Sequence, residues 1–162
     1  GIRAGFKRGD VTINDILAVM PFGNFACTAT MTGQQLLDVM EFSVSMLPYE
    51  SGAFLQVSGI SYEVDASIPT HVVIDDENLF SYVADDERRI SNLKILNSMT
   101  GEYEAVELEK TYTVASFDYL LTEMGSSGIL RYAKPKETYW ATDLEVMMQQ
   151  VRMNDMFFYR KK

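Results

Sequence analysis

The chain has 162 residues, 47% of them apolar and 23% charged, and its formal net charge is −9. This composition is typical of one globular domain and excludes a disordered chain, and the negative charge disfavours nucleic acid as a partner. No apolar run approaches the roughly 20 residues that a membrane span needs, and the single histidine, His71, and single cysteine, Cys27, predict neither a zinc cluster nor an internal disulfide.

Helices are predicted where a threonine precedes an acid or amide by three residues. This spacing occurs in "TIND" (12–15), "TGQQ" (32–35) and, near the end of the chain, "TDLE" (142–145). It is typical of a capping box, in which each side chain bonds the main-chain amide of the other residue. Apolar residues follow at helical spacing and predict one buried stripe per helix: Ile13, Ile16, Leu17 and Met20; then Leu36, Met40, Val44 and Leu47; finally Leu144, Met147, Met148 and Val151.

The first helix is followed by an unusual turn, "PFGN" (21–24). Pro21 ends the helix, and Gly23 allows almost any backbone angle. The aromatic ring of Phe22 between them either packs into the core at the start of a strand or is displayed on a tight turn for another ring to stack on. Asn24 is typical of a residue that completes such a turn.

Strands are predicted where the apolar pattern changes to a period of two. The segment 54–65 is interpreted as two strand halves joined at Ser58–Gly59. Residues 89–96 and 110–120 are each predicted as one strand, with a hairpin turn at Thr100–Gly101 between them. The acidic stretch 66–88 is interpreted as a solvated surface connection. Together these elements predict a single mixed α/β (α+β) domain.

Five motifs in this order give a more specific prediction. They are "GIR" (1–3), "PFGN" (21–24), "TGQQLLDVME" (32–41), "GAFLQVSGISYEVD" (52–65) and "KTYTVASFDYLL" (110–121). The series resembles the C-terminal domain of the 5′-nucleotidase family, which includes periplasmic UDP-sugar hydrolases. The resemblance implies a four-layer α/β/β/α fold and identifies residues 1–162 as a substrate-binding domain for a nucleotide or sugar nucleotide.

The same resemblance implies a partner domain that this chain does not contain. In the family, an N-terminal metallophosphoesterase domain holds two divalent metal ions and performs the hydrolysis. The chain alone is therefore expected to hold no cofactor and to be inactive, and the parent protein is expected in the periplasm or outside the cell. The alternative is a non-catalytic binding or structural module that keeps the fold without specific nucleotide recognition.

The resemblance also implies a substrate site. Phe22 and Tyr119 match the two aromatic residues that sandwich the base, and Arg3 matches the arginine that contacts phosphate, a group that a guanidinium binds with paired hydrogen bonds. Asn24 is a further candidate beside the first ring. The family's loop Y-L-A-x-G-G-D-G is replaced by "YLLTEMGSSGI" (119–129), which is two residues longer and aligns no carboxylate with the family's Asp. The hydroxyl of Ser127 is the candidate ligand contact in this loop.

Overall fold

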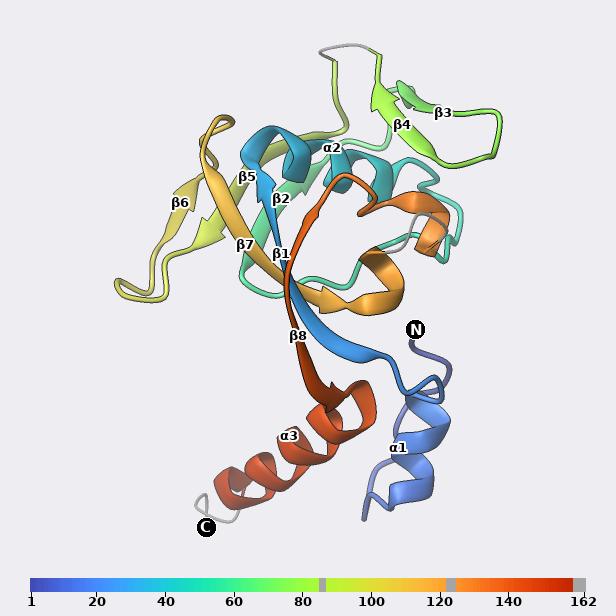
Figure 1. The fold of residues 1–162 in the computed structure, drawn as a ribbon, viewed down its shortest axis with the longest axis vertical. Coiled ribbons are helices and arrows are strands. Elements are labelled where there is room, and N and C mark those ends of the chain that lie inside the picture. Colours follow the sequence, from blue (N-terminus) through green and yellow to red (C-terminus); the bar gives the residue numbers. More distant parts are fainter. Residues whose placement is uncertain (85–86, 122–124, 159–162) are drawn as a thin grey trace.

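The computed structural model describes residues 1–84, 87–121 and 125–158, which contain three α-helices, eight strands and two short 3₁₀ helices (Figure 1). In chain order they are α1 (Ile13–Val19), β1 (Phe25–Thr32), α2 (Gly33–Val44), β2 (Ile60–Val64), β3 (Val72–Ile74), β4 (Phe80–Val83), β5 (Ile90–Leu96), β6 (Tyr103–Ala105), β7 (Thr111–Phe117), η1 (Asp118–Leu121), η2 (Gly125–Gly128), β8 (Lys134–Thr142) and α3 (Asp143–Phe158).

The strands form antiparallel sheets. The first sheet has the order β7-β1-β8, the second β2-β5-β6, and β3 and β4 form a separate hairpin. The central strand β1 pairs with β7 in unbroken register from Ala26–Phe117 to Thr32–Thr111, whereas its pairing with β8 shifts register twice. The expected mixed α/β domain, with helices and antiparallel sheets, is confirmed.

Helix α2 lies at the centre of the hydrophobic core. On one side, Val39 and Phe42 join a cluster with residues of β1 and with Phe80 of β4. On the other side, Leu36 and Met40 pack against Ile90 and Leu93. Because both sides of the helix are covered by strands, its polar residues Glu41 and Ser43 are buried as well.

The buried Glu41 carboxylate accepts hydrogen bonds from main-chain amides at the start of β5. One oxygen accepts from Arg89 N and the other from Ile90 N, each at 3.0 Å. The Arg89 side chain turns the other way and donates to four carbonyl oxygens, three of them at the C-terminal end of α2. These two charged residues thus bond α2 to the second sheet, because buried polar groups need partners.

The three predicted helix starts are confirmed. Thr12, Thr32 and Thr142 each accept a hydrogen bond from the main-chain amide three residues later, and the side chain of that later residue accepts from the amide of the threonine. The buried stripe predicted for α1 is wrong in part, because Ile16 and Val19 are buried but Ile13 and Leu17 are exposed. This helix has only seven residues and lies beside α3 at one end of the molecule, so few residues reach a packed face (Figure 1).

The strand predictions had mixed outcomes. The predicted strands 89–96 and 110–120 correspond to β5 and β7, and the hairpin turn at Thr100–Gly101 joins β5 to β6. Of the segment 54–65, only Ile60–Val64 is a strand, so the prediction of two strand halves is wrong. The interpretation of 66–88 as a surface connection is also wrong, because this stretch contains the β3–β4 hairpin and places Phe80 in the core.

Candidate functional site

Phe22 is displayed on the surface rather than packed into the core. Helix α1 ends at Val19, Pro21 follows, and Phe22 keeps 53% of its surface exposed. Gly23 has a φ of +65°, a left-handed backbone conformation that glycine adopts without strain. The turn therefore re-aims the chain into β1 within two residues and leaves the aromatic ring outside the core.

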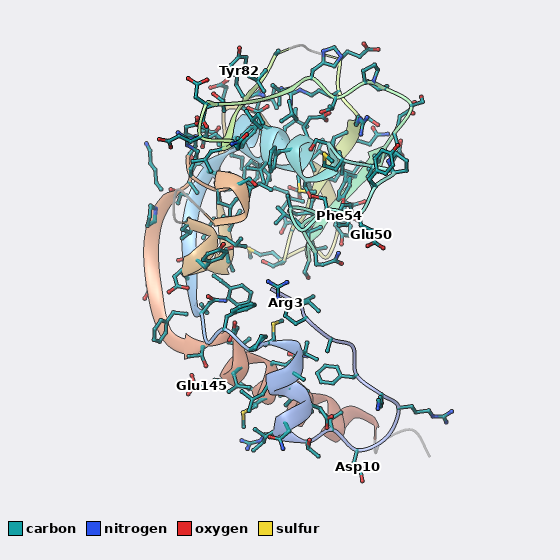
Figure 2. All side chains as sticks on the ribbon, turned by 90° about the vertical axis from the view of Figure 1, so that its right-hand side faces the viewer. Arg3, Asp10, Glu50, Phe54, Tyr82 and Glu145 are labelled. Atoms are coloured by element: carbon teal, nitrogen blue, oxygen red, sulfur yellow. The ribbon has the colours of Figure 1, made fainter. Side chains whose placement is uncertain are left out.

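Arg3 lies against this ring. Its main-chain amide donates to Val19 O at 3.0 Å, which attaches the N-terminal segment to the end of α1. Its guanidinium carbon is 5.1 Å from the centroid of the Phe22 ring, within the range of a cation–π contact. Figure 2 shows Arg3 in the region between the α1–α3 end of the molecule and the part that carries Phe54. The guanidinium of Arg3 and the exposed ring of Phe22 thus lie next to each other.

Asn24 joins the turn to the start of α3. Its side-chain amide donates to Asp143 Oδ2 at 3.1 Å, and its main-chain carbonyl oxygen accepts from the main-chain amide of Asp143 at 2.8 Å. Asp143 is buried, so this pair of hydrogen bonds is protected from water. At least one donor of the Asn24 amide is therefore engaged in holding the turn, and its predicted contact with substrate stays a prediction.

Tyr119 lies in η1, just after the end of the neighbouring strand β7, and is as exposed as Phe22, at 52%. The β1–β7 ladder ends at the pair Ala26–Phe117. Asp118 follows, and its Oδ1 accepts hydrogen bonds from two main-chain amides, that of Phe25 at 3.1 Å and that of Tyr119 at 2.8 Å. One carboxylate oxygen therefore joins the strand that leaves the Phe22 turn to the residue that carries the second ring.

Ser127 lies in η2, which contacts η1 and thus the segment of Tyr119. It is exposed and has a φ of +60°, which is uncommon for a residue other than glycine. Residues 122–124 of the same loop fall outside the described residues. The structure thus brings the segment of Ser127 next to the segment of Tyr119, and the predicted contact of Ser127 with a ligand remains a prediction.

Two residues that hold the candidate site were not singled out from the sequence. Asp118 follows a strand and Asp143 begins a helix, and an acid at either place is a common main-chain acceptor. Neither position predicts which distant main-chain amide will donate to the carboxylate. The negative charge of Asp118 also lies near Cys27, where it adds to the effect of burial, the larger cause, in raising the pKa of the thiol.

The side chains of the candidate site are two exposed aromatic rings, one guanidinium and the polar groups of Asn24 and Ser127. Among the residues that the structure describes, no group of three or more His, Cys, Asp and Glu side chains is placed to hold a metal ion. The described part of this chain therefore does not fit a dimetal centre. In the same residues, no helix is both long enough and apolar enough to cross a bilayer.

Comparisons with known proteins agree on one family. The model of the 5′-nucleotidase C-terminal domain matches residues 1–131. The chain is 30% identical over 152 residues to the trifunctional nucleotide phosphoesterase protein YfkN of Bacillus subtilis, covering 94% of this chain and 9% of that protein. It is 38% identical over 79 residues to a 5′-nucleotidase of Vibrio parahaemolyticus, covering 49% of this chain and 14% of that one.

A solved structure extends the agreement to the fold. The 5′-nucleotidase precursor of Thermus thermophilus superposes with a TM-score of 0.74 at 26% sequence identity, covering 92% of this chain and 26% of that chain. The chain thus spans only a small share of the length of the relatives it matches.

Proposed function

Since this chain belongs to the 5′-nucleotidase C-terminal domain family, we propose that it is the substrate-binding domain of a metal-dependent phosphoester hydrolase that acts on nucleotides or sugar nucleotides. The relatives it matches include proteins named 5′-nucleotidase and nucleotide phosphoesterase. The domain stacks the base and orients the phosphate toward metals on another domain.

One observation carries the proposal. Phe22 and Tyr119 are both about half exposed, and the backbone segments that carry them meet at one carboxylate. Aromatic residues of a core would be buried, whereas rings that stack on a base must keep a face open. Stacking on an aromatic ring contributes about 1–3 kcal/mol per base and tolerates different bases.

Arg3 supplies the charge that a phosphate requires. Its guanidinium lies at the Phe22 ring, so a nucleotide whose base stacks there brings its phosphate within reach of the same end of the molecule. A guanidinium presents paired donors to phosphate oxygens. Asn24 follows the Phe22 turn and Ser127 lies in η2, which contacts the segment of Tyr119; in this proposal both add polar contacts to the ribose or the base.

The hydrolytic step belongs to a second domain. An N-terminal metallophosphoesterase domain would hold two divalent metal ions, which would supply an activated water and electrostatic stabilisation of the transferred phosphoryl group. The role of this chain is to bind and orient the substrate there. The parent protein is expected in the periplasm or outside the cell, in agreement with the family. We expect no phosphate release from AMP by this chain alone, with or without added manganese.

The proposal is tested by titrating this chain with adenosine, AMP and ribose 5-phosphate, followed by NMR chemical shifts. Phe22→Ala and Tyr119→Ala should each weaken adenosine and AMP binding by about tenfold or more, which is the range of one lost stacking contact. Ribose 5-phosphate, which has no base, should be affected far less. Arg3→Ala should weaken AMP and ribose 5-phosphate but leave adenosine nearly unchanged.

A matched control is Tyr82→Ala. Tyr82 is an equally exposed tyrosine, at 55%, and it lies on the β3–β4 hairpin far from Arg3 (Figure 2). This variant should bind all three compounds like the unchanged chain. Equal losses in Tyr82→Ala and Tyr119→Ala, or no binding of any of the compounds at millimolar concentration, would contradict the proposal and favour a non-catalytic structural module.

A further inference from the structure

The two rings of the candidate site are carried by different segments, and each needs an anchor. The Phe22 turn is anchored on one side to the start of α3 through Asn24 and Asp143. Tyr119 lies beyond the end of β7, on the opposite edge of the same sheet from β8. The anchor of the turn on α3 therefore does not fix where Tyr119 lies.

The main-chain ladder between β1 and β7 stops just short of the site. Its last pair is Ala26–Phe117, and the next residues along, Phe25 and Asp118, are joined through a side chain instead. Asp118 Oδ1 accepts from Phe25 N at 3.1 Å and from Tyr119 N at 2.8 Å. Hydrogen bonds to a charged acceptor are stronger than those between neutral groups. Because Asp118 and Tyr119 are neighbours in the chain, the two segments cannot separate here without breaking the bond from Phe25 N.

We propose that Asp118 is a positioning residue for the substrate site, whose carboxylate fixes the spacing between the Phe22 turn and Tyr119. A sandwich gains from two rings only if both are held at the separation of a flat ring before the ligand arrives. Asp118 supplies this constraint from the protein side and does not touch the ligand. The inference rests on the proposed function, because it concerns how the two rings are placed.

The test compares four variants of this chain. Asp118→Ala removes the acceptor, and Asp118→Asn keeps a carbonyl oxygen that can still accept from both amides. Asp65→Ala is the matched control. Asp65 Oδ1 likewise accepts a hydrogen bond from a nearby main-chain amide, that of Ser67 at 2.9 Å, but in a different part of the fold. Phe22→Ala reports on the proposed function independently. The probe is adenosine, and the backbone amide resonances of Phe25 and Tyr119 report the hydrogen bonds directly.

The expected result is a graded loss. Asp118→Ala should weaken adenosine binding about tenfold, which is within the range for one lost stacking contact, and should increase amide exchange at Phe25 and Tyr119. Asp118→Asn should restore most of the affinity, and Asp65→Ala should bind like the unchanged chain. Far-UV circular dichroism and the urea midpoint show whether Asp118→Ala is folded. If Asp118→Ala is unfolded, the inference is decided by Asp118→Asn, from its affinity for adenosine and its amide exchange at Phe25 and Tyr119.

Two results overturn the inference in distinguishable ways. If Phe22→Ala loses adenosine binding while Asp118→Ala keeps it, the base site stands and Asp118 does not position it. If Phe22→Ala binds adenosine as well as the unchanged chain, or the unchanged chain does not bind it, the proposed function fails and the inference fails with it. Equal losses in Asp118→Asn and Asp118→Ala, with both folded, would also overturn it.

Discussion

Replacing Arg89 by methionine should lower the free energy of unfolding by about 3–5 kcal/mol. The guanidinium donates to Val44 O, Ser45 O, Leu47 O and Ile68 O, at 3.2, 2.9, 2.9 and 2.7 Å. The first three lie at the C-terminal end of α2, where carbonyls lack helical partners and a positive charge is favoured. Each bond to a charged group contributes about 1.5–3 kcal/mol. Three of these contacts share the two hydrogens of Nη1, and three of the four acceptors are only half-buried, so water can replace part of the lost bonding. The net loss therefore corresponds to about two such bonds.

Urea denaturation followed by circular dichroism measures this loss. With a slope of about 2 kcal/mol per molar urea, the midpoint of Arg89→Met should fall by about 2 M. Lys94→Met is the control, because Lys94 is exposed on the same strand β5, and surface substitutions usually change stability by less than about 0.5 kcal/mol. If the two variants had the same midpoint, the bonds of Arg89 to the end of α2 would not stabilise the fold as argued.

Three further predictions concern other parts of the fold. Gly33→Ala should destabilise by about 1–3 kcal/mol, although alanine is normally the better helix residue. The added Cβ would lie 2.8 Å from the carbonyl carbon of Glu107, and a raised urea midpoint would contradict this. The hydrogen bond from Arg131 holds the pKa of Asp75 below its usual range in the folded chain. The ionised Asp75 therefore stabilises the fold at any pH above its pKa in the unfolded chain, and this stabilisation is lost as the pH falls through its pKa in the folded chain. Thermal unfolding of Arg131→Gln should thus depend less on pH below about 4 than that of the unchanged chain, and identical profiles would refute the role of the pair. Cys27 is buried and burial raises the pKa of its thiol, so iodoacetamide at pH 8 should leave it unmodified until urea unfolds the chain, as mass spectrometry would show.

The helix starts were predictable because a capping box is local. Each threonine and its partner are three residues apart, and their bonds form whatever the rest of the chain does. The display of Phe22 was half predictable in the same way. Pro21 and Gly23 indicate a turn, but only the tertiary structure decides whether the ring faces the core or the solvent.

The central strand β1 was not predicted, although every second residue from Cys27 to Met31 is buried. Its inward residues are mostly small and its outward ones are mainly threonine and alanine, so the difference in polarity between the faces is weak. The burial of Phe80 was not predicted either, because this residue lies in an acidic stretch whose composition is typical of a solvated surface segment. In both cases burial comes from packing on α2, and that packing joins residues far apart in the sequence.

The role of Asp118 could not be predicted either. Its bond to Phe25 N joins residues 93 positions apart and exists only because β1 and β7 pair in one particular register. A shift of that register by one residue would face the carboxylate with a different amide. The sequence motif indicates the rings, whereas the register of the sheet decides how they are held.

The central position of α2 has a consequence for how the molecule opens. Since this helix packs against β1, β4 and β5 together, its amide hydrogens can exchange with solvent only when these strands come apart, in a global unfolding event. Helices α1 and α3 contact each other at one end of the chain's fold, away from β2–β6 (Figure 1), so they can open as a separate, less stable unit. The end of the molecule that carries Arg3 can thus fluctuate, while the bond from Phe25 N to Asp118 Oδ1 keeps the chain that follows the Phe22 turn attached to the segment of Tyr119.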